Sequence, residues 1–473
     1  MAAFEAGAVT VDISPDDEWF RVRRRNMLQM SHDLYYRTNS FTEGVAEPVW
    51  IRTLITRQND KMMVLITADL IAIQPWLSAW VRAELGRKWG LENTQIAVTC
   101  SHAHSTPPYT ENEPYGKWIA EQMVASVQAA IANLEPARIG ATHGFCNNLS
   151  YYERIPITSE NAAQLGAVPS HIGGIKHSRD YIEARAAAGP IDPQVGVVRI
   201  DHADGTPKAV LVHFTAHPAI EIEPPHVSPD YVGFAMKKIQ RKLPGVVPLF
   251  CQGADGAINI NNMFGTLKHA KKHGETLANE VLRVLDSIET TDRVEAAYAS
   301  RLSHLEFSPI PAQENLDEEL AACQTYVENL KDHPDDVWVG HGSYTINLPS
   351  GFPPEARRRM VEVRIKQLEQ ARSQAGRQFP PLPVELQLFR WNDIALIFNP
   401  FELFVQPGLE VKRLSPYRYT FPVCYTGDCV GYVGPASEIA RGGYHFTYFK
   451  PGRYALGNAE RFVKEMITLV KGL

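Results

Sequence analysis

Short apolar runs typical of strands alternate with longer helical patterns through the first half of the chain. This alternation constrains the fold, because a strand and the helix that follows it must bury their apolar sides against a shared core. It predicts an α/β protein with a mixed sheet covered by helices. The expected strands are 50–56, 63–68, 95–100, 137–142, 196–200, 209–214 and 246–250, and the expected helices are 77–89, 115–134 and 231–242.

Two longer segments depart from this pattern. Helical patterns near 315–332 and 354–374 mark a helical insertion over 306–380, and residues 155–190 form a stretch without clear periodicity. A stretch of that length predicts a substrate lid, with a disordered surface insertion as the alternative. A chain of 473 residues can bury one large core or two smaller ones. We expect 1–473 to be a single domain that carries both insertions.

Composition narrows the class of protein. The net charge of −6 and the shortness of the basic runs argue against a nucleic-acid partner. No run approaches the roughly 18 apolar residues of a membrane-spanning helix, and the N-terminus lacks the pattern of a signal peptide. The six cysteines are scattered, which favours reduced thiols. A soluble cytoplasmic protein without an integral membrane segment is therefore expected, and a homo-oligomer is possible.

Two predicted strands end in histidine, which is how a strand end can present a metal ligand. His102 and His104 follow one strand, and His217 follows another. Side chains two residues apart in an extended chain point the same way, so His102 and His104 can face one site. The alternative is a pair of loop histidines bonded to nearby backbone. His213 lies deeper in its strand and is more simply interpreted as a hydrogen-bonded core histidine.

Several short segments follow one another in an order that points to a family. They are 6–15, 101–105, 191–200, 217–218, 399–402, 431–435 and 442–444. Together they resemble the catalytic domain of the neutral ceramidases, which are zinc-dependent amidases, and the resemblance spans roughly 6–449. It implies the fold of that domain. We expect the family's C-terminal immunoglobulin-like domain to be absent.

The resemblance also implies a Zn²⁺ site. By their places in the matching segments, His102, His217 and Glu402 are the expected ligands. Two histidines and one carboxylate leave a position for water, whose pKa zinc lowers toward neutrality. Without the histidines, Glu402 would be interpreted as a carboxylate at the start of a helical pattern over 402–413, interacting with the helix dipole.

Two positions depart from the family pattern. Cys429 stands where the family has a zinc-binding tyrosine. Either Cys429 is the fourth ligand, or Tyr432 reaches the metal, or water fills that place, or Cys429 is simply a small buried residue. In the glycine loop that begins at Gly253, Ala257 replaces the family's aspartate, and Asp255 lies two residues earlier. The backbone amides of this loop could still bind a substrate carbonyl or phosphate, and the alternative is an ordinary glycine turn.

The remaining expected site residues have catalytic or binding roles. His104 is the expected base, which takes a proton from water and returns it to the leaving group. Arg154 is similar in placement to an arginine that contacts substrate in the family, and Asp255 is assigned to the catalytic group. The expected substrate-binding residues are Tyr109, Tyr152, Gly253 and Tyr444, whose aromatic members could stack on a ring.

These features predict a zinc-dependent hydrolase that uses a metal-activated water to cleave an amide bond in a small soluble substrate other than ceramide. One alternative is a metal-dependent esterase or lactonase. Another is a non-catalytic metal- or carbohydrate-binding protein. A serine hydrolase built on Ser101 or Ser105 is disfavoured, because neither serine has a glycine elbow around it.

Overall fold

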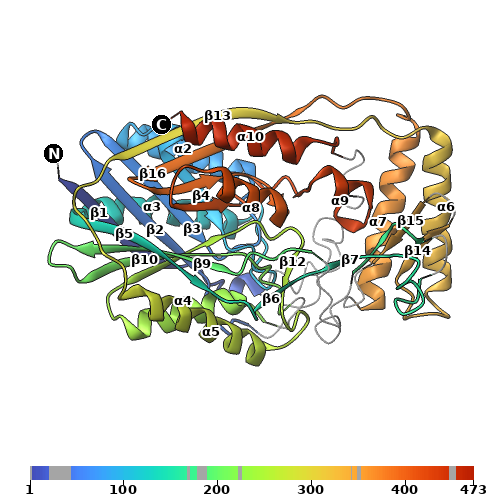
Figure 1. The fold of residues 1–473 in the computed structure, drawn as a ribbon, viewed down its shortest axis with the longest axis horizontal. Helices are drawn as coiled ribbons and strands as arrows, with labels where there is room; N and C mark the ends of the chain where they lie inside the picture. The colour runs from blue at the N-terminus through green and yellow to red at the C-terminus, as the bar shows by residue number, and fades with distance from the viewer. Residues whose placement is uncertain are drawn as a thin grey trace.

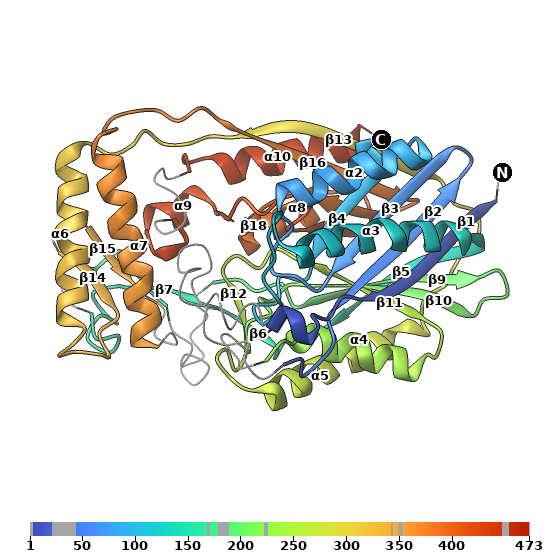
Figure 2. The same ribbon diagram turned by 180° about the vertical axis from the view of Figure 1, so that it is seen from behind.

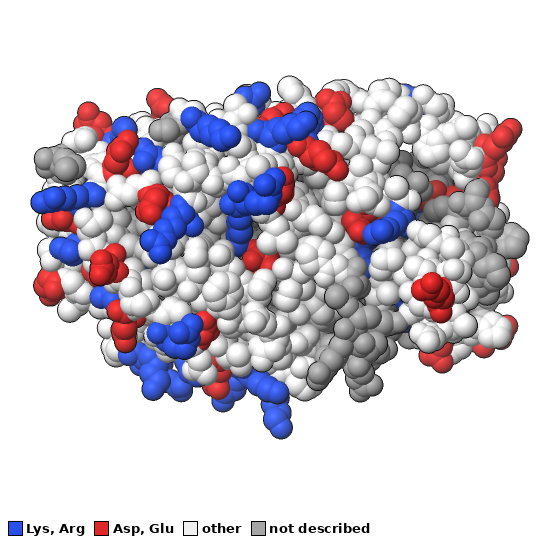
Figure 3. Space-filling model, in the orientation of Figure 1, with Lys and Arg blue, Asp and Glu red and all other residues white. Residues whose placement is uncertain are grey.

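The chain folds into layers of sheet and helix. The computed structural model describes residues 3–20, 44–167, 171–177, 189–221, 226–341, 344–348, 353–446 and 454–472. Figure 1 shows a sheet-rich body with a pair of helices standing at one side of it. On the face drawn in Figure 3, acidic and basic side chains are interspersed over much of the body, with Lys and Arg gathered along the lower edge.

An eight-stranded mixed sheet forms the centre of the body. Its strands, in spatial order, are β11 (Val247–Gln252), β10 (Pro207–Phe214), β9 (Gln194–His202), β5 (Glu135–Phe145), β1 (Phe4–Asp12), β2 (Trp50–Gln58), β3 (Lys61–Ala68) and β4 (Ile96–Cys100). The β3–β4 and β10–β11 pairs are parallel and the other pairs are antiparallel. The predicted mixed sheet is therefore confirmed.

The sheet folds back on itself, so that its two halves face each other. β1 and β5 share only two residue pairs, and β11 packs near β2 and β4. Leu54 and Leu65 of one half and Leu211 and Leu249 of the other belong to one buried cluster. Because β4 and most of β10 are buried, their sequences are nearly continuous apolar runs. The fold-back brings the ends of β4 and β10 into one region.

Helices cover the outer faces of both halves. On one side, α2 (Pro75–Trp89) and α3 (Pro114–Ala132) pack over β2 and β4. On the other side, α4 (Asp230–Lys242) and α5 (Leu267–Leu285) pack together over β9 and β11. Figures 1 and 2 show these pairs on opposite sides of the strands. The sequence analysis missed α5, whose apolar pattern is interrupted by the buried His273 and Gly274.

A second sheet completes the core. It consists of β13 (Ala296–Leu305), β16 (Leu382–Trp391), β17 (Ile394–Phe398) and β19 (Tyr419–Val423), in that order. Phe389, Leu396 and Phe421 of this sheet pack into the cluster between the two halves of the first sheet. Two helices, α8 (Val405–Leu414) and α10 (Asn458–Lys471), pack on each other and cover the opposite face of this second sheet.

The two predicted insertions contact each other beside the body. α6 (Gln313–Asn329) and α7 (Pro354–Arg372) pair, and the hairpin of β14 (Trp338–His341) and β15 (Tyr344–Asn347) touches the short pair β7 (Arg154–Pro156) and β8 (Ile175–His177). The His171 and Trp338 rings stack with centroids 4.0 Å apart. Residues 168–170, 178–188, 342–343 and 349–352 of these insertions lie outside the described residues, so the substrate lid stays a prediction.

The sequence-based assignment of 402–413 as a helix from its first residue was wrong. Residues Glu402–Leu403 form strand β18, which pairs in parallel with β20 (Tyr432–Val433), and α8 begins only at Val405. The Glu402 amide donates to Gly431 O and the Phe404 amide to Val433 O, both at 3.0 Å. Pairing with a distant strand therefore overrides the local helical pattern. Among the described residues, no helix has both the length and the apolarity needed to cross a bilayer.

His213 on β10 is the hydrogen-bonded core histidine that the sequence predicted. It is fully buried, and its Nε2 donates to Pro422 O at 2.8 Å. Burial, together with the charge of Lys412, lowers the pKa of His213 to about 3, although the charge of Asp192 opposes the shift. The folded protein therefore keeps this imidazole neutral where the unfolded chain would protonate it.

This difference predicts a loss of stability in mild acid. Below pH 6.5 the unfolded chain binds a proton at His213 that the folded chain takes up only near pH 3, so the free energy of unfolding falls through that window and is unaffected above it. His213→Gln can still donate to Pro422, and it should lose about 2 kcal/mol less stability than wild type between pH 7 and pH 5. Denaturant unfolding measures this, with the exposed His304→Gln as control. Equal losses in wild type and His213→Gln would contradict the assignment.

Candidate metal centre

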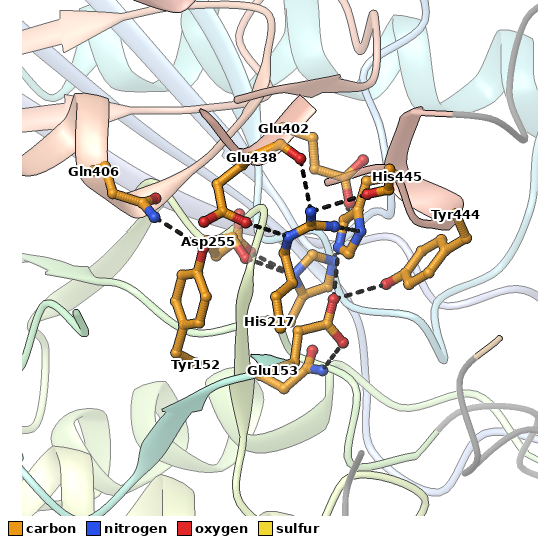
Figure 4. Close-up of polar contacts among 12 residues, drawn as sticks. Tyr152, Glu153, His217, Asp255, Glu402, Gln406, Glu438, Tyr444 and His445 are labelled. Atoms are coloured by element: carbon orange, nitrogen blue, oxygen red, sulfur yellow. Dashed lines mark hydrogen bonds and ion pairs between the residues drawn. The ribbon is translucent and has the colours of Figure 1, made fainter. Parts of the chain in front are cut away.

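Three ligand atoms from distant parts of the chain converge on one point. His102 Nε2 lies 3.2 Å from His217 Nε2 and 3.4 Å from Glu402 Oε1, and His217 Nε2 lies 3.1 Å from the same oxygen. A tetrahedral zinc ion with ligand bonds of about 2.0–2.1 Å sets its ligand atoms about 3.3 Å apart. The observed spacing therefore fits such an ion, and Figure 4 shows His217 and Glu402 side by side.

The backbone after β4 aims His102 at this point. His102 has a left-handed φ of 62°, and its amide donates to Leu70 O at 3.0 Å. Its Nδ1 lies 2.5 Å from Ile71 O, and a carbonyl only accepts, so Nδ1 carries the proton and Nε2 offers its lone pair. The extended geometry assumed from the sequence is therefore wrong at His102. The rings of His102 and His104 still lie close, with centroids 4.9 Å apart.

His217 is held from the opposite side by Asp255. The His217 amide donates to Ile258 O at 2.9 Å, and His217 Nδ1 donates to Asp255 O at 3.0 Å. The Asp255 carboxylate lies 3.4 Å from the same Nδ1. Asp255 thus lies behind His217, on the side away from Glu402, where a carboxylate orients a ligating imidazole. From this place Asp255 can hold the His217 imidazole in its orientation.

Tyr425, which the sequence analysis missed, links the two histidines. Its ring stacks on His102 with centroids 4.0 Å apart and planes 7° from parallel. Its hydroxyl donates to Asp255 Oδ1 at 2.6 Å. Burial raises the pKa of Tyr425 well above its ordinary value, so the hydroxyl keeps the proton that it donates. A lone tyrosine after a strand carries no local signal of this double contact.

The charged side chains around the three converging atoms lie close enough to shift one another's pKa values. Burial opposes ionisation of Glu402, but the close approach of the His102 and His217 imidazoles outweighs it and holds the pKa of Glu402 well below its usual range. Burial lowers the pKa of His217, but Asp255 and Glu402 overcome this effect and raise it to about 9. Positive charge is therefore favoured between Glu402 and Asp255, as a site for a cation requires.

His104 lies beside the three converging atoms. A nitrogen of His104 and nitrogens of His102 and His217 all lie within 4.8 Å of one another. His104 is half-buried, and its amide donates to Pro218 O at 3.0 Å. The structure thus brings together two possible ligand sets, which share His102 and His217 and differ in whether Glu402 or His104 is the third member.

Both candidates for a fourth ligand lie near Glu402. Tyr432 is paired with Glu402 in the β18–β20 register, and its hydroxyl hydrogen-bonds to that carboxylate. Cys429 is half-buried two residues before Gly431, which accepts the Glu402 amide. Burial and the charge of Glu402 raise the pKa of both groups well above their ordinary values. The choice between them stays open.

Arg154 is buried and bound to the segment that follows β20. Its Nε donates to Glu438 Oε2 at 2.8 Å, and its Nη2 donates to Glu438 O and Gly442 O at 2.9 Å. Its Nη1 donates to His445 Nδ1 at 3.0 Å. Four of the five N–H groups of the guanidinium are therefore used within the protein. Arg154 fixes residues 438–445 in place, and its catalytic role stays a prediction.

The bond from Arg154 also defines the protonation state of His445. Arginine can only donate, so His445 Nδ1 accepts and the ring is neutral with its proton on Nε2. That Nε2 lies 2.6 Å from Glu153 Oε1, which also accepts from the Tyr444 hydroxyl at 3.2 Å. Glu153 Oε2 accepts from Asn259 Nδ2 at 2.7 Å. Figure 4 shows this network next to His217 and Glu402. Sequence reasoning missed Glu153, Glu438 and His445.

The predicted substrate-binding residues divide into two groups. Tyr444 belongs to the network, and the buried Tyr152 accepts from Gln406 Nε2 at 2.8 Å near the same region. Tyr109 instead packs in the core, where its hydroxyl donates to Ala72 O at 2.9 Å. A Cβ added at Gly253 would lie 2.1 Å from Thr215 Oγ1, so Gly253 permits close packing. Tyr109 and Gly253 thus pack closely within the protein, and their substrate-binding roles stay predictions.

Two solved structures share this fold. The crystal structure of neutral ceramidase from Pseudomonas aeruginosa matches with a TM-score of 0.66 and 18% identity, covering 100% of this chain and 75% of the ceramidase. A ceramidase complexed with C2 matches with a TM-score of 0.66 and 17% identity, covering 99% and 75%.

Sequence comparisons find no such relatives. No protein-family model matches the chain, and a search of curated proteins finds no match. The structural match takes up this whole chain. The predicted neutral-ceramidase-like fold is therefore confirmed, and the low identity marks the chain as a divergent form of it.

Proposed function

We propose that this protein is a zinc-dependent hydrolase that cleaves an amide bond in a small soluble substrate. The observation that carries the proposal is the convergence of His102 Nε2, His217 Nε2 and Glu402 Oε1 at distances that suit a tetrahedral ion. Similarity to two structures named as ceramidases supports an amide as the target bond. We favour Glu402 over His104 as the third ligand, because Glu402 Oε1 is close to both histidine nitrogens.

The side chains have distinct parts in this mechanism. His102 and His217 would hold the metal through Nε2 and Glu402 through Oε1, while Ile71 O and Asp255 keep the imidazoles oriented. Bound zinc would supply Lewis acidity and an acidified water. His104, beside the ligands, would take the proton of the attacking water and return it to the leaving nitrogen.

The network around Arg154 would shape the substrate side of the site. Arg154 holds the segment with Tyr444 and His445 against Glu153, close to His217. Arg154 is itself fully buried, so it would act on the substrate through this segment. Because the network is polar and charged, it favours a polar substrate over a long hydrocarbon chain.

A cytoplasmic location belongs to the same proposal. All six cysteines are free, and five of them are buried, which suits a reducing compartment. We propose a small molecule as the partner and no nucleic acid. An esterase or lactonase that uses the same metal site is the second candidate, and parallel assays of amides, esters and lactones separate it from the amidase.

Removing a ligand should remove both metal and turnover. Wild type is expected to bind about one zinc per chain, whereas His102→Ala and Glu402→Ala should lose the metal and the hydrolysis together. Elemental mass spectrometry and a panel of amides and esters measure the two properties, with the exposed His304→Ala as control. A wild-type protein that stays metal-free in excess zinc would overturn the proposal. Zinc binding without hydrolysis would favour a metal-binding protein.

His104 should behave differently from the ligands. If it acts as the base, His104→Ala keeps about one zinc per chain and loses about 10²–10⁴-fold in turnover. The same elemental analysis and single-substrate kinetics measure this. Loss of zinc in His104→Ala, with zinc retained in Glu402→Ala, would make His104 the third ligand in place of Glu402.

Asp255 should control metal affinity without touching the metal. Asp255→Asn removes the charge behind His217, and zinc affinity is expected to fall about 10–100-fold. Tyr425→Phe keeps the ring that stacks on His102 and loses only the bond to Asp255, so a smaller loss is expected. Competition with a chromophoric chelator measures both affinities. Unchanged affinity in Asp255→Asn would show that Asp255 does not orient His217.

A further inference from the structure

A short buried segment at the start of α4, residues 228–231, joins the parts of the chain that carry His104 and His217. On the first side, it bonds to Ser105, the residue after His104. The Ser228 amide donates to Ser105 O at 3.0 Å, and the Ser105 hydroxyl donates to Ser228 O at 2.9 Å. Both serines are fully buried. This bridging segment is therefore fixed against the backbone next to His104.

On the second side, the bridging segment binds both ends of the loop 216–221, which contains His217. The Tyr231 hydroxyl donates to the carbonyl of the first residue of this loop at 2.8 Å. Asp230 Oδ2 accepts from the amide of Glu221, the last residue of the loop, at 2.9 Å. Tyr231 and Asp230 are fully buried, so both bonds are shielded from water.

The loop 216–221 in turn holds His104. The His104 amide donates to Pro218 O, in the middle of this loop, at 3.0 Å. The imidazoles of the two histidine ligands are oriented from elsewhere, by Ile71 O and by Asp255. A change in the bridging segment should therefore move His104 and leave the ligand imidazoles in place.

Asp230 has an unusual backbone conformation within the bridging segment. Its φ of 53° lies in the left-handed region, where a residue with a Cβ is strained, although aspartate and asparagine are strained less than most. Such strain persists where the surrounding structure fixes the residue, and it clusters at functional sites. Here Asp230 accepts the Glu221 amide and donates its own amide to Ser228 Oγ at 3.1 Å.

We propose that Asp230 is a positioning residue that holds His104 beside the metal ligands, acting through the loop 216–221. This inference rests on the function proposed above, in which His104 takes the proton of the attacking water. Proton transfer needs donor and acceptor within hydrogen-bond reach, and a misplacement of about 1 Å lowers the rate sharply. A looser loop should therefore slow the chemical step and leave zinc binding unchanged.

Asp230→Gly tests this role, because glycine adopts the left-handed backbone without strain and the variant loses only the carboxylate. Its kcat should fall about 10²-fold, with little change in KM or zinc content. Asp230→Asn keeps one oxygen for the Glu221 amide and should keep most of the turnover. Burial raises the pKa of Asp230 to about 7, so the neutral asparagine resembles a form that is populated near neutrality.

A double-mutant cycle separates the positioning of His104 from general damage to the fold. In the His104→Ala protein, Asp230→Gly should lower turnover less than about twofold, because the base that it positions is already gone. Asp201→Asn is the matched control. Asp201 is also buried, but it pairs with the start of β10, at the end of that strand away from His217. This control should leave kcat unchanged in both backgrounds.

Tyr231→Phe is a milder variant for the same cycle, should Asp230→Gly fail to fold. It keeps the buried ring and loses only the bond at the other end of the loop. We expect a loss of about fivefold in kcat, again only when His104 is present. Circular dichroism checks the fold of each variant.

Hydrogen exchange of the metal-free protein gives a readout that needs neither metal nor substrate. In Asp230→Gly, the amides of His104 and Glu221 should exchange about tenfold faster, whereas those of β4 should keep their wild-type rates. Mass spectrometry with fragmentation measures these rates.

These measurements separate failure of the inference from failure of the proposed function. Equal losses from Asp230→Gly with and without His104, loss of zinc, or unchanged exchange at the His104 amide would each overturn the positioning role. Wild-type turnover in Asp230→Gly would do the same. If the wild-type protein hydrolyses no substrate, the proposed function fails, and the exchange rates still decide whether Asp230 holds His104.

Discussion

The close approach of two imidazoles to one buried carboxylate is the constraint on which the site depends. Glu402 is buried, and a buried carboxylate is stable only when charge and hydrogen bonds compensate it. His102 and His217 supply that compensation from the ends of two strands in opposite halves of the folded sheet. The fold-back of the sheet and the short β18–β20 pair bring these three side chains together.

A second group of contacts fixes the orientation of the two imidazoles. Tyr425 stacks on His102 and bonds to Asp255, which in turn lies behind His217, so one side chain couples both imidazoles. On the other side, Arg154 holds the segment that carries His445. Networks of this kind are stable only when nearly every donor and acceptor is satisfied, and a change at one member should therefore be felt at the metal centre.

The sequence predicted those features that depend on short segments of the chain, and it did not predict contacts between distant segments. Strands that end in His102 and His217 could be recognised from apolar runs, and the order of segments identified Glu402 as their partner. The helix expected from Glu402 onward was wrong, because pairing with Tyr432 draws the first two residues into a strand. The buried Glu153 had no signal, since its partners come from residues more than a hundred positions away.

The sequence by itself determined the layered α/β class, the histidines at strand ends and the similarity in segment order to the neutral ceramidases. Those properties follow from periodicity and from residue types at fixed spacing, which a chain carries before it folds. Only the tertiary structure decided that Asp255 stands behind His217 and that most donors of Arg154 are bound within the protein. Such contacts join residues far apart in the chain, and their distances depend on how whole layers pack.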